Sequence, residues 1–168
     1  KIPYTISGGQ SFFDKTEVRD VLSYLRLLAN DDDDPAFIRA ATTPKRGIGQ
    51  ATLQVLGQYA ASREISLLAA VAETGLESLL APRQLDPLRT FAEFIRRMQW
   101  RAGRGAASGK DAAPAEPAGV ILDDLVEAIQ YERHLFELFE ERPAQTRWQN
   151  VLELTGWLKR KAEEDNMT

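Results

Sequence analysis

The chain has 168 residues, of which 43% are hydrophobic and 27% charged, a composition typical of one globular domain with a substantial core. Its 21 Lys and Arg face 25 Asp and Glu, and the net charge of -4 argues against a general polyanion-binding protein. The absence of cysteine excludes disulfides, thiolate metal ligands and cysteine nucleophiles. Because no apolar run is long enough to span a bilayer and no secretory signal is visible, we expect a cytoplasmic protein with no membrane contact.

Residues 1–9 predict a short strand followed by a hinge. Apolar side chains alternate as far as Ile6, and the small residues Ser7, Gly8 and Gly9 then end the strand. No other segment offers this strand a partner, so we expect it to complete a sheet in a neighbouring domain. The chain begins with Lys1 rather than Met, which indicates a piece of a longer protein.

A helix is expected from just after Asp14 to about residue 30. Asp14 as N-cap and Glu17 three residues later resemble a capping box. An apolar stripe at helical spacing follows, formed by Val18, Val21, Leu22, Leu25 and Leu28.

Four consecutive acids, 31–34, follow this helix. We interpret them as a solvated turn in which Asp34 caps a short helix that has Pro35 in its first position. A cation site is the less favoured reading, because the acids lack the alternating spacing and the glycine of a calcium loop.

The glycine-containing segment 42–50, called the glycine corner below, is the most informative stretch of the chain. Pro44 disfavours helical dihedral angles at Thr43, so the short helix should end there. Gly47 and Gly49 permit left-handed or closely approached backbone, and Ile48 between them is expected to anchor the turn in the core.

A helix that starts at about Gln50 would present unpaired N–H groups and the positive end of its dipole, which together favour a phosphate. Lys45 and Arg46 stand beside this helix start, and the Thr52 hydroxyl lies in its first turn. Residues 35–63 contain no acid, so the local charge is positive although the chain is acidic. These features favour placement on a phosphate backbone; the competing interpretation is a purely structural corner that needed glycine.

The remainder of the chain reads as further helices. We expect them at about 50–62, 66–73, 77–80, from Asp86-Pro87 onward, 120–129, 132–139 and 143–164. Residues 103–118 are rich in Gly, Ala, Ser and Pro and predict a flexible internal linker. A P-loop-like string at 105–111 fails as a nucleotide site because Asp111 replaces the hydroxyl residue and no strand leads into it.

No catalytic or metal-binding constellation is visible. His134 is the only histidine and lacks a second ligand or a nucleophile, so a surface or packed position is expected. Trp100, Trp148 and Trp157 stand at helical spacing on apolar faces and are expected in the core. The fold class expected is all-α: a compact multi-helix domain with a helix–Gly-Ile-Gly turn–helix motif and one orphan N-terminal strand.

Several blocks of the sequence resemble the 2B subdomain of UvrD/Rep-type superfamily 1 DNA helicases. The first block runs from Ile2 to Phe13 (IPYTISGGQSFF) and continues with Glu17-Val18-Arg19-Asp20 and Tyr24-Leu25-Arg26. The second is Thr43-Pro44-Lys45-Arg46-Gly47-Ile48-Gly49 with Thr52, and the third is Gln145-Thr146-Arg147 with Asn150, Val151 and Leu154. The sequences of residues 7–13 and 52–57 are most similar to those of the Rep branch of this family.

The resemblance implies a bacterial, ATP-dependent helicase that moves 3′ to 5′ on DNA. Residues 1–9 would then be the end of a 2A motor-domain strand and its hinge, and residues 10–168 the 2B subdomain. This subdomain swivels against the helicase's own motor domains, which hold the ATP and Mg²⁺, and no cofactor is expected in this piece. The glycine motif would grip duplex DNA at a single-strand/double-strand junction, with replication or repair proteins as further partners.

The residues that the resemblance places on DNA are Thr43, Lys45, Arg46, Gly47, Ile48, Gly49, Thr52 and Arg19. Arg19 is itself a departure, because the family often has Lys there. The linker at 103–118 is longer than the family usually has. The main alternative, from a different functional class, is a helical protein-interaction domain whose glycine corner is only structural, and a free-standing enzyme has no nucleophile–base pair to support it.

Overall fold

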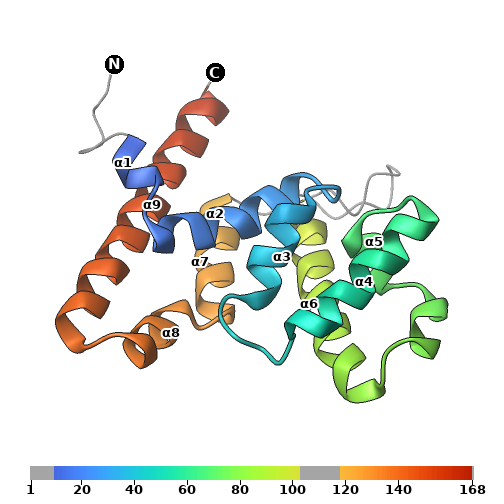
Figure 1. Ribbon diagram of the computed structural model, residues 1–168. Helices are drawn as coiled ribbons and strands as arrows, with labels where there is room; N and C mark the ends of the chain where they lie inside the picture. Colours follow the sequence, from blue (N-terminus) through green and yellow to red (C-terminus); the bar gives the residue numbers. More distant parts are fainter. Residues whose placement is uncertain (1–9, 103–117, 168) are drawn as a thin grey trace. The chain divides into compact units, whose positions relative to one another are not determined.

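The computed structural model describes residues 10–102 and 118–167, and within these ranges the chain forms only helices and turns (Figure 1). This confirms the all-α prediction for the described part of the chain. The predicted strand and the hinge residues Ser7, Gly8 and Gly9 lie outside the described residues. So does the predicted linker up to residue 117, with its P-loop-like string, whereas Ala118 already begins a helix.

The chain divides into two compact units. Unit 1 combines Lys1–Leu22 with Glu116–Thr168, and unit 2 is the continuous stretch Ser23–Ala115. The boundary falls inside helix α2 (Thr16–Ala29), so one helix contributes its first half to unit 1 and its second half to unit 2.

Unit 1 is built on α1 (Gln10–Phe13), the first half of α2, α7 (Ala118–Ala128), α8 (Tyr131–Leu138) and α9 (Glu141–Met167). Helices α7, α8 and α9 contact one another. Their shared core contains Val18, Val21, Val126, Tyr131, Leu135, Val151 and Leu154. Two of the tryptophans join it from the side: Trp148 packs against the core, and Trp157 meets Phe13 edge-on with ring centroids 5.6 Å apart.

Unit 2 contains the second half of α2, α3 (Asp34–Thr42), α4 (Gln50–Arg63), α5 (Leu67–Val71), the 3-10 helix η1 (Thr74–Ser78) and α6 (Pro82–Arg101). Helix α5 contacts α3, α4 and α6. The core centres on Phe91 of α6, which is 1% exposed and packs edge-on against Phe37 at 5.4 Å and Tyr24 at 6.2 Å. Such aromatic pairs add to the free energy gained by burying their area.

Helix α6 begins earlier than the sequence suggested. Asp86-Pro87 was expected to open this helix, but the helix starts at Pro82 and Pro87 lies inside it. The Gln84 side chain accepts a hydrogen bond from the Ala81 N–H at 3.1 Å, and Pro82 stands in the first turn where its missing N–H costs nothing. The real start therefore carries its own cap, and the Asp-Pro pair misled the prediction.

The capping box predicted at Asp14 and Glu17 is wrong. Helix α2 starts at Thr16, and the Lys15 carbonyl accepts the Arg19 N–H at 2.9 Å. The Glu17 side chain is instead buried and accepts hydrogen bonds from Arg147 Nη1 at 2.9 Å and Asn150 Nδ2 at 2.7 Å. A carboxylate that carries such a long-range ion pair is not available to close its own helix turn.

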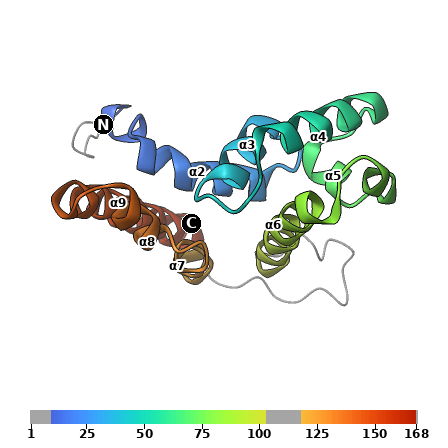
Figure 2. The same ribbon diagram turned by 60° about the horizontal axis from the view of Figure 1, so that its bottom comes forward.

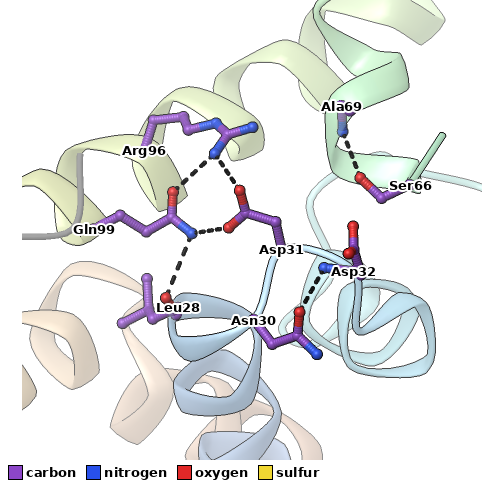
Figure 3. A network of polar contacts seen from close by, with 8 residues as sticks. All are labelled: Leu28, Asn30, Asp31, Asp32, Ser66, Ala69, Arg96 and Gln99. Atoms are coloured by element: carbon purple, nitrogen blue, oxygen red, sulfur yellow. Dashed lines mark hydrogen bonds and ion pairs between the residues drawn. The ribbon is translucent and has the colours of Figure 1, made fainter. Parts of the chain in front are cut away.

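Each of the acids at 31, 33 and 34 makes a specific contact, so the run is more than a solvated turn. The Asp31 carboxylate accepts from Arg96 at 2.9 Å and from the Gln99 amide, and Gln99 also donates to the Leu28 carbonyl (Figure 3). The α3 N-cap is Asp33, which accepts from the Ala36 N–H, and not Asp34 as predicted. Asp34 instead accepts the Leu67 N–H at 3.1 Å at the start of α5.

The prediction that all three tryptophans lie in the core is wrong for Trp100. Its side chain is 50% exposed near the end of α6, whereas the other two tryptophans are partly buried in unit 1. It lines, with Leu68, Val71 and Arg97, a groove of about 600 Å³ on unit 2. The apolar stripe of α6 is narrower at its last turn than the spacing implied.

Candidate nucleic-acid interface

The glycine corner joins the end of α3 to the start of α4 within unit 2 (Figure 2). Helix α3 ends at Thr42, and Thr43 takes an extended conformation with φ -136° and ψ 115°. The Thr43-Pro44 peptide bond is cis. The predicted helix end before Pro44 and the predicted helix start at Gln50 are both confirmed.

The two glycines of the corner have different conformations. Gly47 has φ +85°, a left-handed value that side chains rarely adopt, and a β-carbon there would lie 3.6 Å from Pro87 Cγ. Gly49 has φ -93° and ψ 171°, and no atom lies within 4 Å of the place where its β-carbon would be. The turn itself requires glycine at position 47, whereas at position 49 glycine only leaves the surface open.

Ile48 lies between these two glycines and anchors the corner in unit 2. Its side chain is 8% exposed, as predicted for an apolar anchor. Thr52 is also buried, at 4% exposure, although its hydroxyl was considered as a phosphate ligand. The side chains of these two residues therefore stabilise the corner from inside, whereas Lys45, Gly47, Gly49 and Gln50 are exposed.

The start of α4 is open to an anion. Gly49 is the N-cap residue and has no side chain to accept from the first N–H groups of the helix. Gln50 and Ala51, the first two helical residues, are exposed. A helix N-terminus with unpaired N–H groups and a positive dipole end attracts a phosphate or carboxylate.

The two basic residues of the corner differ in placement. Lys45 is exposed, and no carboxylate among the described residues pairs with it. Arg46 is partly buried: its guanidinium lies 4.8 Å from the centroid of the Phe91 ring and donates from Nε to the Pro44 carbonyl at 3.3 Å. Only Lys45 therefore extends a charged group into solvent at this place.

The Tyr24 hydroxyl connects the corner to α2 and α3. It lies 2.6 Å from the Thr43 carbonyl and 2.9 Å from the Ala40 carbonyl, and it accepts a hydrogen bond from Arg46 Nη2. A tyrosine hydroxyl has one proton, which the two carbonyls share, and a lone pair of the same oxygen accepts from Arg46. The Tyr24 ring is completely buried, which fixes the position of the hydroxyl.

The sequence reasoning missed Tyr24 and Phe91 as parts of this site. Both stand at ordinary core positions of amphipathic helices, and Phe91 lies 45 residues after Arg46. The only available signal was Tyr24 itself, because a buried tyrosine hydroxyl needs a polar partner. The pattern did not reveal which partner it has.

The other predicted contact residues are more scattered. Arg19 is exposed on the first half of α2, in unit 1, whereas the corner belongs to unit 2. Arg63, part of the acid-free stretch, pairs with Glu73 at 2.6 Å. The positive patch inferred from the sequence is therefore weaker in the structure, because an acid from outside the stretch neutralises one of its cations.

Neither a metal centre nor a membrane span is found in the described part of the chain. No three His, Asp or Glu residues there are grouped so that they could hold a metal ion. No helix within these residues is both long enough and apolar enough to cross a bilayer. The half-buried His134 packs against the Tyr131 ring at 5.3 Å, and burial holds its pKa below the ordinary value, although Asp20 and Glu137 oppose this shift.

The fold and the corner together define a class of protein: within the described residues it is all-helical, and it exposes a helix start without a side-chain cap beside a glycine turn and a lysine that none of these residues pairs with. The comparisons with known proteins find similar sequences among DNA helicases. Residues 1–78 match the UvrD-like helicase C-terminal domain. ATP-dependent DNA helicase Rep of Salmonella typhimurium is 42% identical over 159 residues, which are 94% of this chain and 22% of the relative.

Two further relatives agree. Rep of Escherichia coli is 39% identical over the same share of both chains, and DNA helicase II of Escherichia coli is 36% identical over 91% of this chain and 20% of its own length. The chain is therefore similar to a segment of each of these helicases. It spans about a fifth of the length of these relatives.

Proposed function

We propose that this chain is the non-catalytic 2B subdomain of an ATP-dependent 3′–5′ DNA helicase of the Rep/UvrD type, and that it grips duplex DNA ahead of the fork. The observation that carries the proposal is the glycine corner, where an open helix start and an exposed lysine lie on a rigid support. ATP and Mg²⁺ would act in motor domains outside this chain, in the bacterial cytoplasm.

The chemistry of the corner suits a phosphate backbone. The N–H groups at the start of α4 can each donate to a phosphate oxygen, and Lys45 supplies a charge that the described residues do not neutralise. Phosphate contacts position a protein on DNA without reading its sequence, which is what an enzyme that moves along any sequence requires. The proposed contacts are the backbone of Gly47 to Gly49 and the Lys45 side chain, with Thr43 at the edge and Ile48 and Thr52 as buried supports.

The proposed function also implies how the subdomain is regulated and which partners it has. With residues 7–9 as a hinge, the subdomain would swivel against its own motor domains and change which DNA it meets at a single-strand/double-strand junction. Arg19 on unit 1 is proposed as a second, independent phosphate contact, because it is exposed on α2. Replication or repair proteins are the expected further partners.

The second candidate function is a helical protein-interaction domain in which the corner has only a structural role. The inward position of Arg46 favours it, because one of the two corner cations is used within the fold. The two functions differ in how binding responds to salt, since only phosphate contacts release condensed counterions.

The test is duplex affinity as a function of salt for the full-length parent protein with Lys45→Ala. We expect weaker duplex binding and a slope of log K against log salt that is smaller by about 0.9, the contribution of one phosphate contact. Lys161→Ala, which removes an exposed lysine at the far end of the chain, is the matched control and should change neither quantity.

The thermal unfolding of each variant is measured beside the binding. If Lys45→Ala folds normally and leaves both the affinity and the slope unchanged, the duplex-grip function is wrong and the protein-interaction function is favoured. If both lysine variants lower the slope equally, binding is diffuse and does not depend on the corner.

A further inference from the structure

The structure assigns Arg46 and Tyr24 as positioning residues of the glycine corner: they fix the main chain that receives the phosphate, and neither contacts DNA. This inference rests on the proposed duplex-binding function and reverses the contact role expected for Arg46. It begins from the direction of the Arg46 side chain, which turns away from solvent toward Phe91.

The Arg46 guanidinium is held on several sides at once. Its plane lies over the Phe91 ring, Nε donates to the Pro44 carbonyl, and Nη2 donates to the Tyr24 hydroxyl. Arginine is suited to this place because its rigid, planar fork can stack on an aromatic ring and donate in fixed directions. To reach a phosphate in solvent, Arg46 would have to give up all three interactions.

These contacts hold the first half of the corner. Tyr24 binds the carbonyl of Thr43, the residue before the cis peptide bond, while Arg46 binds the carbonyl of Pro44 and is itself followed by Gly47. The chain between Thr43 and Gly47 is thus tied to the buried rings of α2 and α6. Gly47, with its left-handed φ, and the start of α4 come directly after this segment in the chain.

Rigidity matters here because the proposed binding surface is main chain. A backbone N–H can only aim at a phosphate oxygen if its own dihedral angles are held, and ordering a loose loop on binding would reduce the affinity. Loss of the Tyr24 hydroxyl or the Arg46 fork should therefore weaken duplex binding without removing a phosphate contact.

The deciding variants keep the charge of the protein. Tyr24→Phe removes one hydroxyl and retains the buried ring, and Arg46→Lys retains the cation but loses the planar fork and the stacking. In the full-length parent protein we expect each to weaken duplex binding by about 10-fold, because the loosened corner must be ordered when it binds. The salt slope should stay at the value of the unchanged protein, in contrast to Lys45→Ala.

A second measurement separates this inference from the proposed function. Amide hydrogen exchange of residues 47–52 in the DNA-free protein should accelerate in both charge-preserving variants, because the corner is no longer held. Faster exchange with no loss of duplex binding would show that Tyr24 and Arg46 hold the corner although the corner does not bind DNA, so the proposed function would fail while the positioning role stands. Unchanged exchange in both variants would overturn the positioning role.

Direct contact of Arg46 with phosphate gives the opposite pattern. Arg46→Lys would then retain binding to within about twofold, Tyr24→Phe would have no effect, and Arg46→Ala would lower the salt slope as much as Lys45→Ala does. That result would overturn the positioning role while the duplex-binding function stands.

Discussion

Among the described residues, Arg147 and Arg46 each place the guanidinium over a phenylalanine ring, and their surroundings differ in one respect. Arg147 of unit 1 lies 4.1 Å from the Phe139 ring centroid and forms an ion pair with the buried carboxylate of Glu17 at 2.9 Å. Arg46 of unit 2 lies 4.8 Å from the Phe91 ring centroid, but its hydrogen-bond partners are a hydroxyl and a carbonyl. No carboxylate within the described residues pairs with Arg46.

The comparison shows how the same side chain can serve two purposes. The charge of Arg147 is neutralised within unit 1, so that arginine stabilises the packing of α9 on α2. The charge of Arg46 is not neutralised, so its positive potential adds to that of Lys45 and the α4 start although its atoms face inward. Positioning and electrostatic attraction can thus come from one residue that never touches the ligand.

The largest effect on stability is expected from Glu17→Ala, which breaks the ion pair of Arg147. The change leaves the Arg147 guanidinium and the Asn150 amide without their carboxylate, and we expect a loss of about 2–3 kcal/mol in the free energy of unfolding. This value is below the range usual for a fully buried pair, about 3–5 kcal/mol, because the Arg147 side chain is 35% exposed. Urea unfolding of the chain measures it.

The matched control is Glu137→Ala, which breaks the exposed ion pair with Arg133 on α8. It should change the stability by no more than about 0.5 kcal/mol. Equal effects of the two changes would show that the Glu17–Arg147 pair is no stronger than a surface pair. The double variant Glu17→Ala with Arg147→Ala should be less destabilised than the sum of the single changes.

The next largest effect on stability is expected at the glycines of the corner. Gly47 is needed for its backbone conformation, whereas Gly49 only leaves the surface open. Gly47→Ala places a β-carbon on a residue with φ +85° and should destabilise the chain by about 1–2 kcal/mol. Gly49→Ala, with extended backbone and open space around it, should stay within about 0.5 kcal/mol. Thermal unfolding compares the two.

The same pair then sharpens the binding hypothesis. If Gly49→Ala leaves the fold intact but weakens duplex binding, its β-carbon obstructs a close approach to the main chain. If Gly49→Ala destabilises the fold as much as Gly47→Ala, the open surface described for position 49 is incorrect.

The smallest effect concerns His134 on α8, which belongs to unit 1 as Arg147 does. Because burial lowers its pKa in the folded chain, protonation favours the unfolded state. The stability linked to this group is fully present above the unfolded pKa of about 6.5 and is lost as the pH falls through that value toward the lower folded pKa. Stability measured between pH 7.5 and 5 should fall less steeply for His134→Gln; an identical pH dependence would contradict the shift.

Much of the fold could be predicted because each helix carries its own signal. The apolar stripes predicted most helices to within a few residues, and Ser66, which accepts from the Ala69 N–H, marks the start of α5. The errors at Glu17 and Asp34 share one cause. Each is an acid that could cap a neighbouring helix, and no local pattern shows that a partner far along the chain, such as Arg147 or Leu67, takes up the carboxylate of Glu17 or Asp34.

The candidate site was predicted in part. The turn at Gly47, the anchor Ile48 and the helix start at Gln50 follow from local chemistry, because dihedral preference and burial are written in neighbouring residues. The inward turn of Arg46 could not be predicted, since it depends on Phe91 in another helix. Whether the corner binds duplex DNA remains a prediction, to be tested with Lys45.

The division of α2 between two units has a consequence for the order in which the chain can fold during synthesis. Unit 2 is one continuous stretch, and its described helices are complete once Arg101 of α6 has been made. Unit 1 consists of the segments before and after that stretch in the sequence. The Glu17 carboxylate therefore cannot pair with Arg147 until 130 more residues have been translated. Unit 2 can therefore close while the last third of the chain is still being translated, and the first turns of α2 are held open until α9 emerges from the ribosome.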